Sequence, residues 1–341
     1  MGTETLYIGV DLGTFRSVMV SNDGHDEQVL TVIGTPKDSI AKNFLRRDVL
    51  FGEEALKNRL ALNLYRPLEH GVIKDTVEDK KYIAHFINHM MNLADPEDYD
   101  RVVAVIGAPA EASHVDKTAI FDAAAGTVNA CMIISEPFAV AYALDMLDHT
   151  MVVDIGAGTT DICRVYGTIP RPEDQLHINK AGDFIDARLI EEIQRKYVGA
   201  QITKDMSRRW KEQFSFTSAS PPKDPVIVDF SIEGKAMSLD ITDCLSNACE
   251  GIVDGIVANI KKLISDSNPE YHDAFRQNII LAGGGSGIRG LGATIEERLS
   301  DLGEITVHVV EDPVKLGAHG GLRLAQEVPE EYWKNLTISD Q

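Results

Sequence analysis

Two short segments of the chain place an aspartate, glycines and a threonine directly after an apolar strand. The first is Asp11-Leu-Gly13-Thr14, and the second is Asp154-Ile-Gly156-Ala-Gly158-Thr159. Glycine lets backbone N–H groups approach a phosphate closely, N–H groups in a turn form an anion-binding nest, and threonine adds a hydroxyl donor. An aspartate at the end of the strand can hold the waters around Mg²⁺. One copy would fit a plain hairpin turn equally well, but two copies in one chain predict a paired site for phosphate and Mg²⁺.

A third glycine cluster follows an apolar strand at Asn278–Leu281. It runs from Gly283 to Gly290 and contains a formal G-x-G-x-x-G, with Glu311 further along the chain. This spacing is typical of a dinucleotide-binding fingerprint. Only one more strand follows it, which is too little chain for a doubly wound sheet. A dehydrogenase would also leave both aspartate turns unexplained, so we set that interpretation aside.

The segments around these turns alternate between short apolar strands and amphipathic helices, which is typical of the α/β class. The first turn follows a strand at Leu6–Val10, and the second follows a strand at Met151–Asp154. We also expect a third strand at Gln28–Ile33 and one long helix at Cys244–Ser265. The repeated design predicts that the chain has two related halves.

The composition argues against several classes of function. The chain has 341 residues, 44% of them hydrophobic, which suits about two globular domains. Its net charge of −20 repels phosphate backbones and anionic lipids, so we expect no nucleic-acid partner and no direct membrane insertion. The start at Met1–Thr3 has no basic signal region, and Asn335–Gln341 forms no amphipathic stretch, which favours a cytoplasmic protein. Four scattered cysteines indicate buried thiols rather than disulfides, and His85 and His89 lack the acidic neighbour of a zinc motif.

Five segments resemble the motifs of the actin, Hsp70 and sugar-kinase superfamily. They correspond to its first phosphate loop, first connecting helix, second phosphate loop, adenosine motif and second connecting helix. In chain order they are Asp11–Thr14, Ser135–Ala141, Asp154–Asp161, Leu281–Ser286 and Gly317–Gly321. Two further phrases, Ala181-Gly182-Asp183 and Lys211-Glu-Gln-Phe214, are similar to those of the bacterial actins. These include the rod-shape actins and the actin-like proteins of magnetotactic bacteria.

The resemblance implies an α/β, actin-like two-lobed ATPase fold. Each lobe would be a mixed β-sheet flanked by helices, and a nucleotide cleft between the lobes would hold ATP and Mg²⁺. The first lobe would comprise residues 1–150 and 322–341, with a small subdomain at about 34–72. The second would comprise residues 151–321, with a small subdomain at about 184–250.

The resemblance also gives each motif residue an expected role. Asp11 and Asp154 would organise the waters of Mg²⁺, Glu136 would orient the attacking water, and Asp161 would assist it. The other expected nucleotide contacts come from the two turns, from the residue before Asp183 and from the glycine cluster. They are Gly13, Thr14, Phe15, Arg16, Gly156, Ala157, Gly158, Thr159, Gly182, Gly283, Gly284, Gly285, Ser286 and Ile288.

Some of these residues also have a simpler explanation. Lys211 and Glu212 would reach the adenine and the ribose, but they equally suit a solvated helix face. Glu136 would be favourable at any helix N-terminus, because the helix dipole attracts a carboxylate there. Arg16 stands where relatives carry small or polar residues, so it either grips phosphate with its guanidinium or points to solvent.

The function implied by the resemblance is that of a polymerising cytoskeletal ATPase. Such a protein would assemble with copies of itself into filaments that organise magnetosomes in a chain, with protein adaptors making the attachment. A chaperone of the same superfamily would need an additional substrate domain. The alternatives that stay open are a rod-shape bacterial actin without a link to magnetosomes and a small-molecule kinase of the same superfamily.

Overall fold

The computed structural model of the protein describes residues 4–69, 72–73, 77–110 and 112–333. The chain forms two compact units, one of Met1–Leu147 with Val314–Gln341 and the other of Asp148–Pro313. The expected boundary at residue 322 would cut the helix α12 (Leu316–Glu327), whereas the compact division keeps this helix whole in the first unit. The expectations for Met1–Thr3 and Asn335–Gln341 lie outside the described residues.

The central sheet of the first unit combines an antiparallel meander with parallel strands. Strand β1 pairs antiparallel with β2 and parallel with β9, and β9 pairs parallel with β10. In this register Asp11, the last residue of β1, lies beside Val18 on one side and Gly107 on the other. In spatial order the strands are β10 (Ala130–Ser135), β9 (Arg101–Ala108), β1 (Thr5–Asp11), β2 (Arg16–Ser21) and β3 (Asp26–Leu30).

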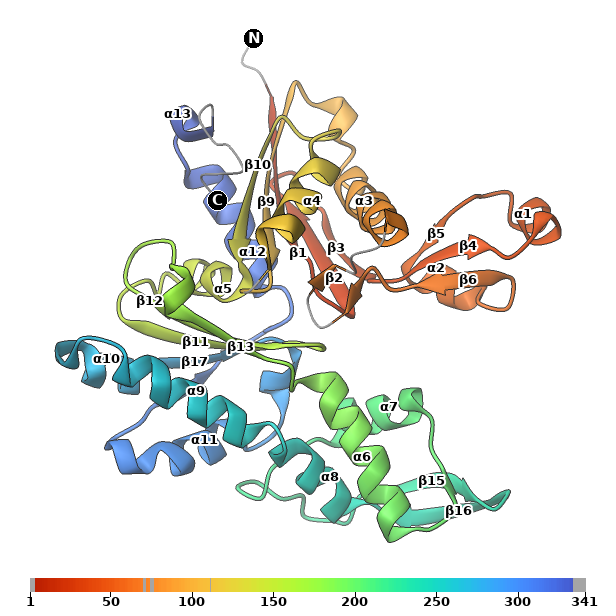
Figure 1. The fold of residues 1–341 in the computed structure, drawn as a ribbon, viewed down its shortest axis with the longest axis vertical. Helices are drawn as coiled ribbons and strands as arrows, with labels where there is room; N and C mark the ends of the chain where they lie inside the picture. Colours follow the sequence, from red (N-terminus) through yellow and green to blue (C-terminus); the bar gives the residue numbers. More distant parts are fainter. Residues whose placement is uncertain (1–3, 70–71, 74–76, 111, 334–341) are drawn as a thin grey trace. The chain divides into compact units, whose positions relative to one another are not determined.

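Helices cover both faces of this sheet (Figure 1). Alternate residues of β1, such as Leu6 and Ile8, share a core with α3 (Val77–Asn92), which packs beside α4 (His114–Ala124). On the other face α12 lies directly on β1, because a Cβ at Gly9 would overlap its backbone. The helix α5 (Glu136–Ala143) packs against α12 on the same side.

A smaller sheet follows the meander in the first unit. It consists of β5, β4 and β6, and Val32, Leu50, Ala55 and Leu62 form its own small core. The expected single strand at Gln28–Ile33 is wrong, because the chain turns at residue 31 and starts a new strand in this sheet. The remaining elements of the first unit are β4 (Ile33–Pro36), α1 (Ser39–Leu45), β5 (Leu50–Phe51), α2 (Gly52–Lys57), β6 (Leu62–Tyr65), β7 (Leu68–Glu69), β8 (Val72–Ile73), a 3₁₀ turn at Pro96–Asp98 and α13 (Glu330–Trp333).

The central sheet of the second unit repeats the pattern of the first. Strand β11 pairs antiparallel with β12 and parallel with β17, so that Asp154 lies beside Asp161 and Ala282. The prediction of two related halves is confirmed at the level of strand pairing. The strands in spatial order are β13 (Gln175–Ile178), β12 (Thr160–Val165), β11 (Thr150–Ile155), β17 (Ile279–Ala282) and β18 (Val307–Val309).

The helices of the second unit surround one large apolar core. The expected long helix at Cys244–Ser265 is wrong, since α8 ends at Glu250 and α9 begins at Val253. Gly251 lies at the break, where a Cβ would come within 3.0 Å of the Phe184 ring. The remaining elements are 3₁₀ turns at Pro172–Asp174, Pro269–Tyr271, Gly284–Gly287 and Ser300–Leu302, strands β14 (Ala200–Gln201), β15 (Ile227–Ile232) and β16 (Lys235–Asp240), and helices α6 (Gly182–Lys196), α7 (Lys204–Phe214), α8 (Thr242–Glu250), α9 (Val253–Ser265), α10 (His272–Gln277) and α11 (Leu291–Leu299).

Among the helices of the described residues, none combines the length and the apolar character needed to cross a bilayer.

Candidate nucleotide site

The first predicted phosphate-binding turn, Asp11–Thr14 (the first phosphate turn), joins β1 to β2 and is held by the buried Thr31. Thr31 donates its backbone N–H to the carbonyl oxygen of Phe15 at 2.9 Å and its hydroxyl to the carbonyl oxygen of Gly13 at 2.7 Å. These two bonds tie the turn to the residue that directly follows β3. Gly13 is required there, because a Cβ would overlap the carbonyl oxygen of Arg16.

The two unusual residues of this turn point to different neighbours. The guanidinium of Arg66 lies 5.3 Å from the centre of the Phe15 ring. Arg16 is exposed and donates a hydrogen bond to Gln28 Oε1 on the adjacent strand at 3.0 Å. The Arg16 guanidinium is thus engaged with the adjacent strand at the surface of the sheet.

Of the four carboxylates expected to act on Mg²⁺ and water, Asp11 and Glu136 lie near each other in the first unit. Asp11 ends β1, and its neighbour across the sheet is Gly107 on β9. Glu136 begins α5 directly after β10, and its Cγ is 3.6 Å from where a Cβ on Gly107 would lie. Asp11 and Glu136 thus flank Gly107, at the carboxyl ends of neighbouring parallel strands.

Asp11 is set in surroundings that suit a bound cation. Gly317 of α12 faces its carboxylate, since a Cβ there would be 3.0 Å from Asp11 Oδ2. Burial raises the pKa of Asp11 from its ordinary value of 3.8 to about 7. A cation beside this carboxyl would favour its ionised form, so the residue fits the role of an Mg²⁺ partner.

The second predicted phosphate-binding turn, Asp154–Thr159 (the second phosphate turn), accepts hydrogen bonds from the first residues of α6. The backbone N–H of Gly156 donates to Thr159 at 2.9 Å within the turn. Gly182 donates its N–H to the carbonyl oxygen of Gly156 at 3.1 Å, and Asp183 donates to that of Ala157 at 2.7 Å. Each phosphate turn therefore accepts hydrogen bonds from the segment that follows the third strand, in chain order, of its own central sheet.

Asp154 and Asp161 are cross-strand neighbours and so project from the same face of the sheet. Asp161 is 1% exposed. Gly283 closes over Asp154 in a left-handed conformation, with φ of 72°, and a Cβ there would overlap the Asp154 carboxylate. The glycine cluster and the second turn are therefore packed together in one unit, as the motifs predict.

The expected adenosine segments come together through a pairing that the sequence did not predict. Phe216, just after α7, forms a parallel bridge with Arg289, which follows the glycine cluster. This bridge links α7, which carries Lys211 and Glu212, to the loop that contains Ser286. Ser286 is buried and donates its hydroxyl to the carbonyl oxygen of Gly283 at 2.8 Å, so it stabilises the loop itself.

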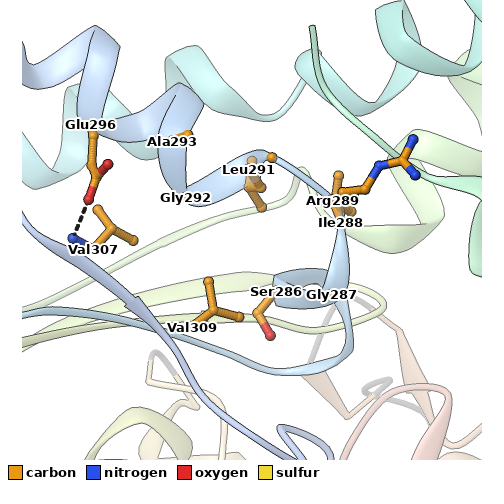
Figure 2. A pocket seen from close by; sticks show the side chains of 11 residues that line it. Ser286, Gly287, Ile288, Arg289, Leu291, Gly292, Ala293, Glu296, Val307 and Val309 are labelled. Atoms are coloured by element: carbon orange, nitrogen blue, oxygen red, sulfur yellow. Dashed lines mark hydrogen bonds between the residues drawn. The ribbon is translucent and has the colours of Figure 1, made fainter. Parts of the chain in front are cut away.

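An open pocket of about 380 Å³ adjoins this loop (Figure 2). Ser286 and Ile288 line it from the loop, and Val307 and Val309 line it from β18. Glu296 of α11 accepts a hydrogen bond from the backbone N–H of Val307 at 2.8 Å at its far end. Residues 154–159 of the second turn do not line this pocket, so it borders the adenosine loop and not the phosphate turn.

Lys211 and Glu212 differ in their surroundings. Glu212 is exposed, as on a solvated helix face. Lys211 is mostly buried, and its Nζ lies 2.7 Å from Asp186 Oδ1 and donates to the carbonyl oxygen of Gly182 at 2.8 Å. Burial raises the pKa of Asp186, while the ammonium of Lys211 opposes that shift.

Two residues of interest near the turns, Thr31 and Asp186, were not predicted from the sequence. Thr31 lies within an apolar run and gave no signal. Asp186 did carry one, because it is a fully buried acid on the apolar face of α6, beside Ile185 and Leu189. A charged residue within an apolar stripe needs a partner, which here is the cation of Lys211.

The four cysteines are buried, and His89 of the histidine pair packs against an aromatic ring. All four cysteines are buried and free, and burial raises the pKa of Cys131 and of Cys249 to about 12. His89 stacks on Phe51 with ring centroids 4.1 Å apart. These observations agree with packing roles.

Comparison with known proteins relates this arrangement to one family. The family model described as MreB/Mbl protein matches residues 5–332, which include both turns and the glycine cluster. The chain belongs to the MreB/Mbl family. Its fold is actin-like, as expected from the motifs.

Within the family, the chain is similar to MamK. It is 39% identical to the actin-like protein MamK of Paramagnetospirillum magneticum over 332 residues, which cover 97% of this chain and 95% of that protein. The structure matches that of a MamK double helical filament with a TM-score of 0.90 at 39% identity, covering 95% of this chain and 100% of the other. It also matches a non-polymerising MamK mutant bound to AMPPNP, with a TM-score of 0.78 at 39% identity over 96% of this chain and 100% of the other.

Proposed function

We propose that this chain is an ATPase that polymerises into actin-like filaments and organises magnetosomes in a chain. The observation that carries the proposal is the pair of phosphate turns, each at the end of the central strand of its sheet and each held by the segment that follows its hairpin. The similarity to MamK, which forms double helical filaments, supports the assembly part of the proposal. In this scheme the two units are the two lobes of the protein.

The residues of both units fit ATP with Mg²⁺. Gly13, Thr14 and the segment from Gly156 to Thr159 would bind the phosphates, and Asp11 and Asp154 would hold the metal through its waters. When bound, Mg²⁺ would neutralise part of the negative charge on the phosphates. Gly182 and the residues from Gly283 to Ile288 would form the remainder of the nucleotide site.

Hydrolysis needs a group that orients water. Glu136 is suited to this, because it begins α5 and lies near Gly107, the cross-strand neighbour of Asp11. Positioning the nucleophile and stabilising the spreading charge account for most of the catalysis in phosphoryl transfer. Asp161, beside Asp154, would assist from the second unit.

The filament would be built from copies of this chain in the cytoplasm. Head-to-tail contacts between identical subunits repeat without closing, which produces a filament rather than a ring. Attachment to magnetosomes would then require protein adaptors, since the chain carries a net charge of −20 that anionic lipid surfaces repel.

The experiment that tests the proposal follows phosphate release and sedimentation in the same samples. We expect both to require ATP together with Mg²⁺ and both to stop when the metal is chelated. A protein that converts ATP to ADP only when candidate sugars are added, with the phosphoryl group transferred to the sugar and no phosphate released, would instead be a small-molecule kinase. A protein that binds no ATP would contradict the whole proposal.

A further inference from the structure

The ammonium of Lys211 is held between two acceptors on α6. One is the carboxylate of Asp186, at 2.7 Å, and the other is the carbonyl oxygen of Gly182, at 2.8 Å. Asp186 is fully buried and the side chain of Lys211 is 13% exposed. An ion pair with so little contact with water is held much more tightly than a surface pair.

This ion pair is linked by hydrogen bonds to the second phosphate turn. Gly182, which Lys211 holds through its carbonyl group, donates its own N–H to Gly156 at 3.1 Å. The next residue, Asp183, donates to Ala157 at 2.7 Å. A Cβ on Gly182 would lie 3.1 Å from Lys211 Nζ, so the lysine fills the space that a side chain would take.

The direction of these bonds fixes where the turn can bind an anion. In a trans peptide the carbonyl oxygen and the following N–H point in opposite directions. Because the carbonyl groups of Gly156 and Ala157 point to α6, the N–H groups of Ala157 and Gly158 point away from it. Those N–H groups are the ones that a phosphate would meet.

We propose that Asp186 and Lys211 are positioning residues for the second phosphate turn. Asp186 holds Lys211, and Lys211 holds the start of α6 against Gly156 and Ala157, so that the N–H groups of the turn face the phosphates. The inference rests on the proposed ATP binding, and it gives Lys211 a role in phosphate affinity instead of a contact with the base.

The same cluster indicates which substitution should disturb the fold less. Asp186 has a second cation near it, because Arg208 Nε lies 3.4 Å from its Oδ2. Removing Lys211 therefore leaves this buried carboxylate a partner, whereas removing Asp186 leaves the ammonium of Lys211 without its anion. Lys211→Met also keeps most of the apolar stem of the side chain.

The test compares ATP and GTP, which carry a nucleobase, with tripolyphosphate, which carries none. The affinities of Mg²⁺-bound tripolyphosphate, ATP and GTP are measured by competition against a fluorescent ATP analogue. We expect Lys211→Met to weaken tripolyphosphate and ATP by the same factor, about 10–100-fold as for other supporting residues of a ligand site, and to leave the ratio of ATP to GTP affinity unchanged. Lys211→Arg should restore tripolyphosphate binding, since a guanidinium can reach both acceptors.

Two further variants serve as controls. Arg209→Met removes an exposed cation from the same helix and should bind all three ligands like the parent. Asp186→Leu combined with Lys211→Met replaces the ion pair by apolar side chains, which often preserves stability. We expect this double variant to melt near the temperature of the parent and still to lose tripolyphosphate affinity.

Two results would overturn the inference. If Lys211→Met loses ATP affinity but keeps tripolyphosphate affinity, and the preference for ATP over GTP changes, then Lys211 contacts the base. If all three affinities stay at the parental level, the ion pair does not position the turn. A parent protein that binds neither ATP nor tripolyphosphate would contradict the proposed function itself.

Discussion

Glu136 is the residue whose replacement should separate hydrolysis from binding. It begins α5 and lies over Gly107, next to Asp11 but outside both phosphate turns. Loss of a positioned group that handles the attacking water typically costs about 10²–10⁴-fold in rate. We expect Glu136→Ala to release phosphate slower by this factor while it still binds ATP and still sediments as filaments. Phosphate release at the parental rate would show that another residue orients the water.

Asp11→Ala, unlike Glu136→Ala, should weaken nucleotide binding itself. Asp11 is the carboxylate that we assign to the waters of Mg²⁺, and Gly317 packs against it. Without it, nucleotide affinity and assembly should fall together, and excess Mg²⁺ should restore them only in part. Titration with a fluorescent ATP analogue at several Mg²⁺ concentrations measures this. A variant with parental affinity would remove Asp11 from the metal site.

The sequence predicts the chemistry of single residues better than the residues that support them. Asp11, Asp154 and the turn glycines could be proposed from the sequence because their types and local spacing suit phosphate and Mg²⁺. The roles of Thr31 and Asp186 could not be predicted, since Thr31 meets Gly13 and Asp186 meets Lys211 only in the folded chain. Lys211 shows the same limit, because its sequence context does not reveal the buried carboxylate that it meets.

At the scale of elements, the close packing of α12 is the feature most sensitive to side-chain size. A Cβ on Gly320 would overlap the carbonyl oxygen of Ala139 on α5, so the two helices touch through their backbones. Alanine would gain about 1 kcal/mol from helix propensity, but overpacking at such a contact costs about 1–3 kcal/mol and forces the backbone to move. We expect Gly320→Ala to lower the free energy of unfolding in chemical denaturation.

Gly292 provides a matched control for this prediction. It is also a helical glycine, in α11, but a Cβ there would meet only Val307 and Val309 at 3.4–3.5 Å, an ordinary contact. Gly292→Ala should therefore raise the free energy of unfolding by up to about 1 kcal/mol. If both variants shift stability in the same direction, the backbone contact of α12 does not govern its packing.

Elements with a clear local signal could be predicted from the sequence, and those decided by tertiary contacts could not. The strands before both turns and the two connecting helices match their predicted positions. The break between α8 and α9 was missed because apolar periodicity continues through Gly251, while the packing of Phe184 against that residue is decided by α6. The small sheet that contains β4 was missed for a similar reason, as Thr31 turns the chain out of β3.

At the scale of the whole molecule, charge should control assembly. Each subunit carries −20, so neighbouring subunits in a filament repel one another. Salt shortens the Debye length from about 30 Å at 0.01 M to about 8 Å at 0.15 M. We expect the critical concentration for assembly with ATP and Mg²⁺ to fall over this range, as light scattering would show. A critical concentration that rises with salt would mean that attraction between opposite charges dominates the contacts.

Electron microscopy of the purified protein shows directly whether ATP and Mg²⁺ drive filament assembly. Samples with ATP and Mg²⁺, with ATP and a chelator, and without nucleotide would be imaged at the same protein concentration. We expect long unbranched filaments in the first sample and few or none in the other two. Only monomers in all three samples, at every salt concentration tried, would contradict the assignment of this chain as an ATP-dependent filament protein.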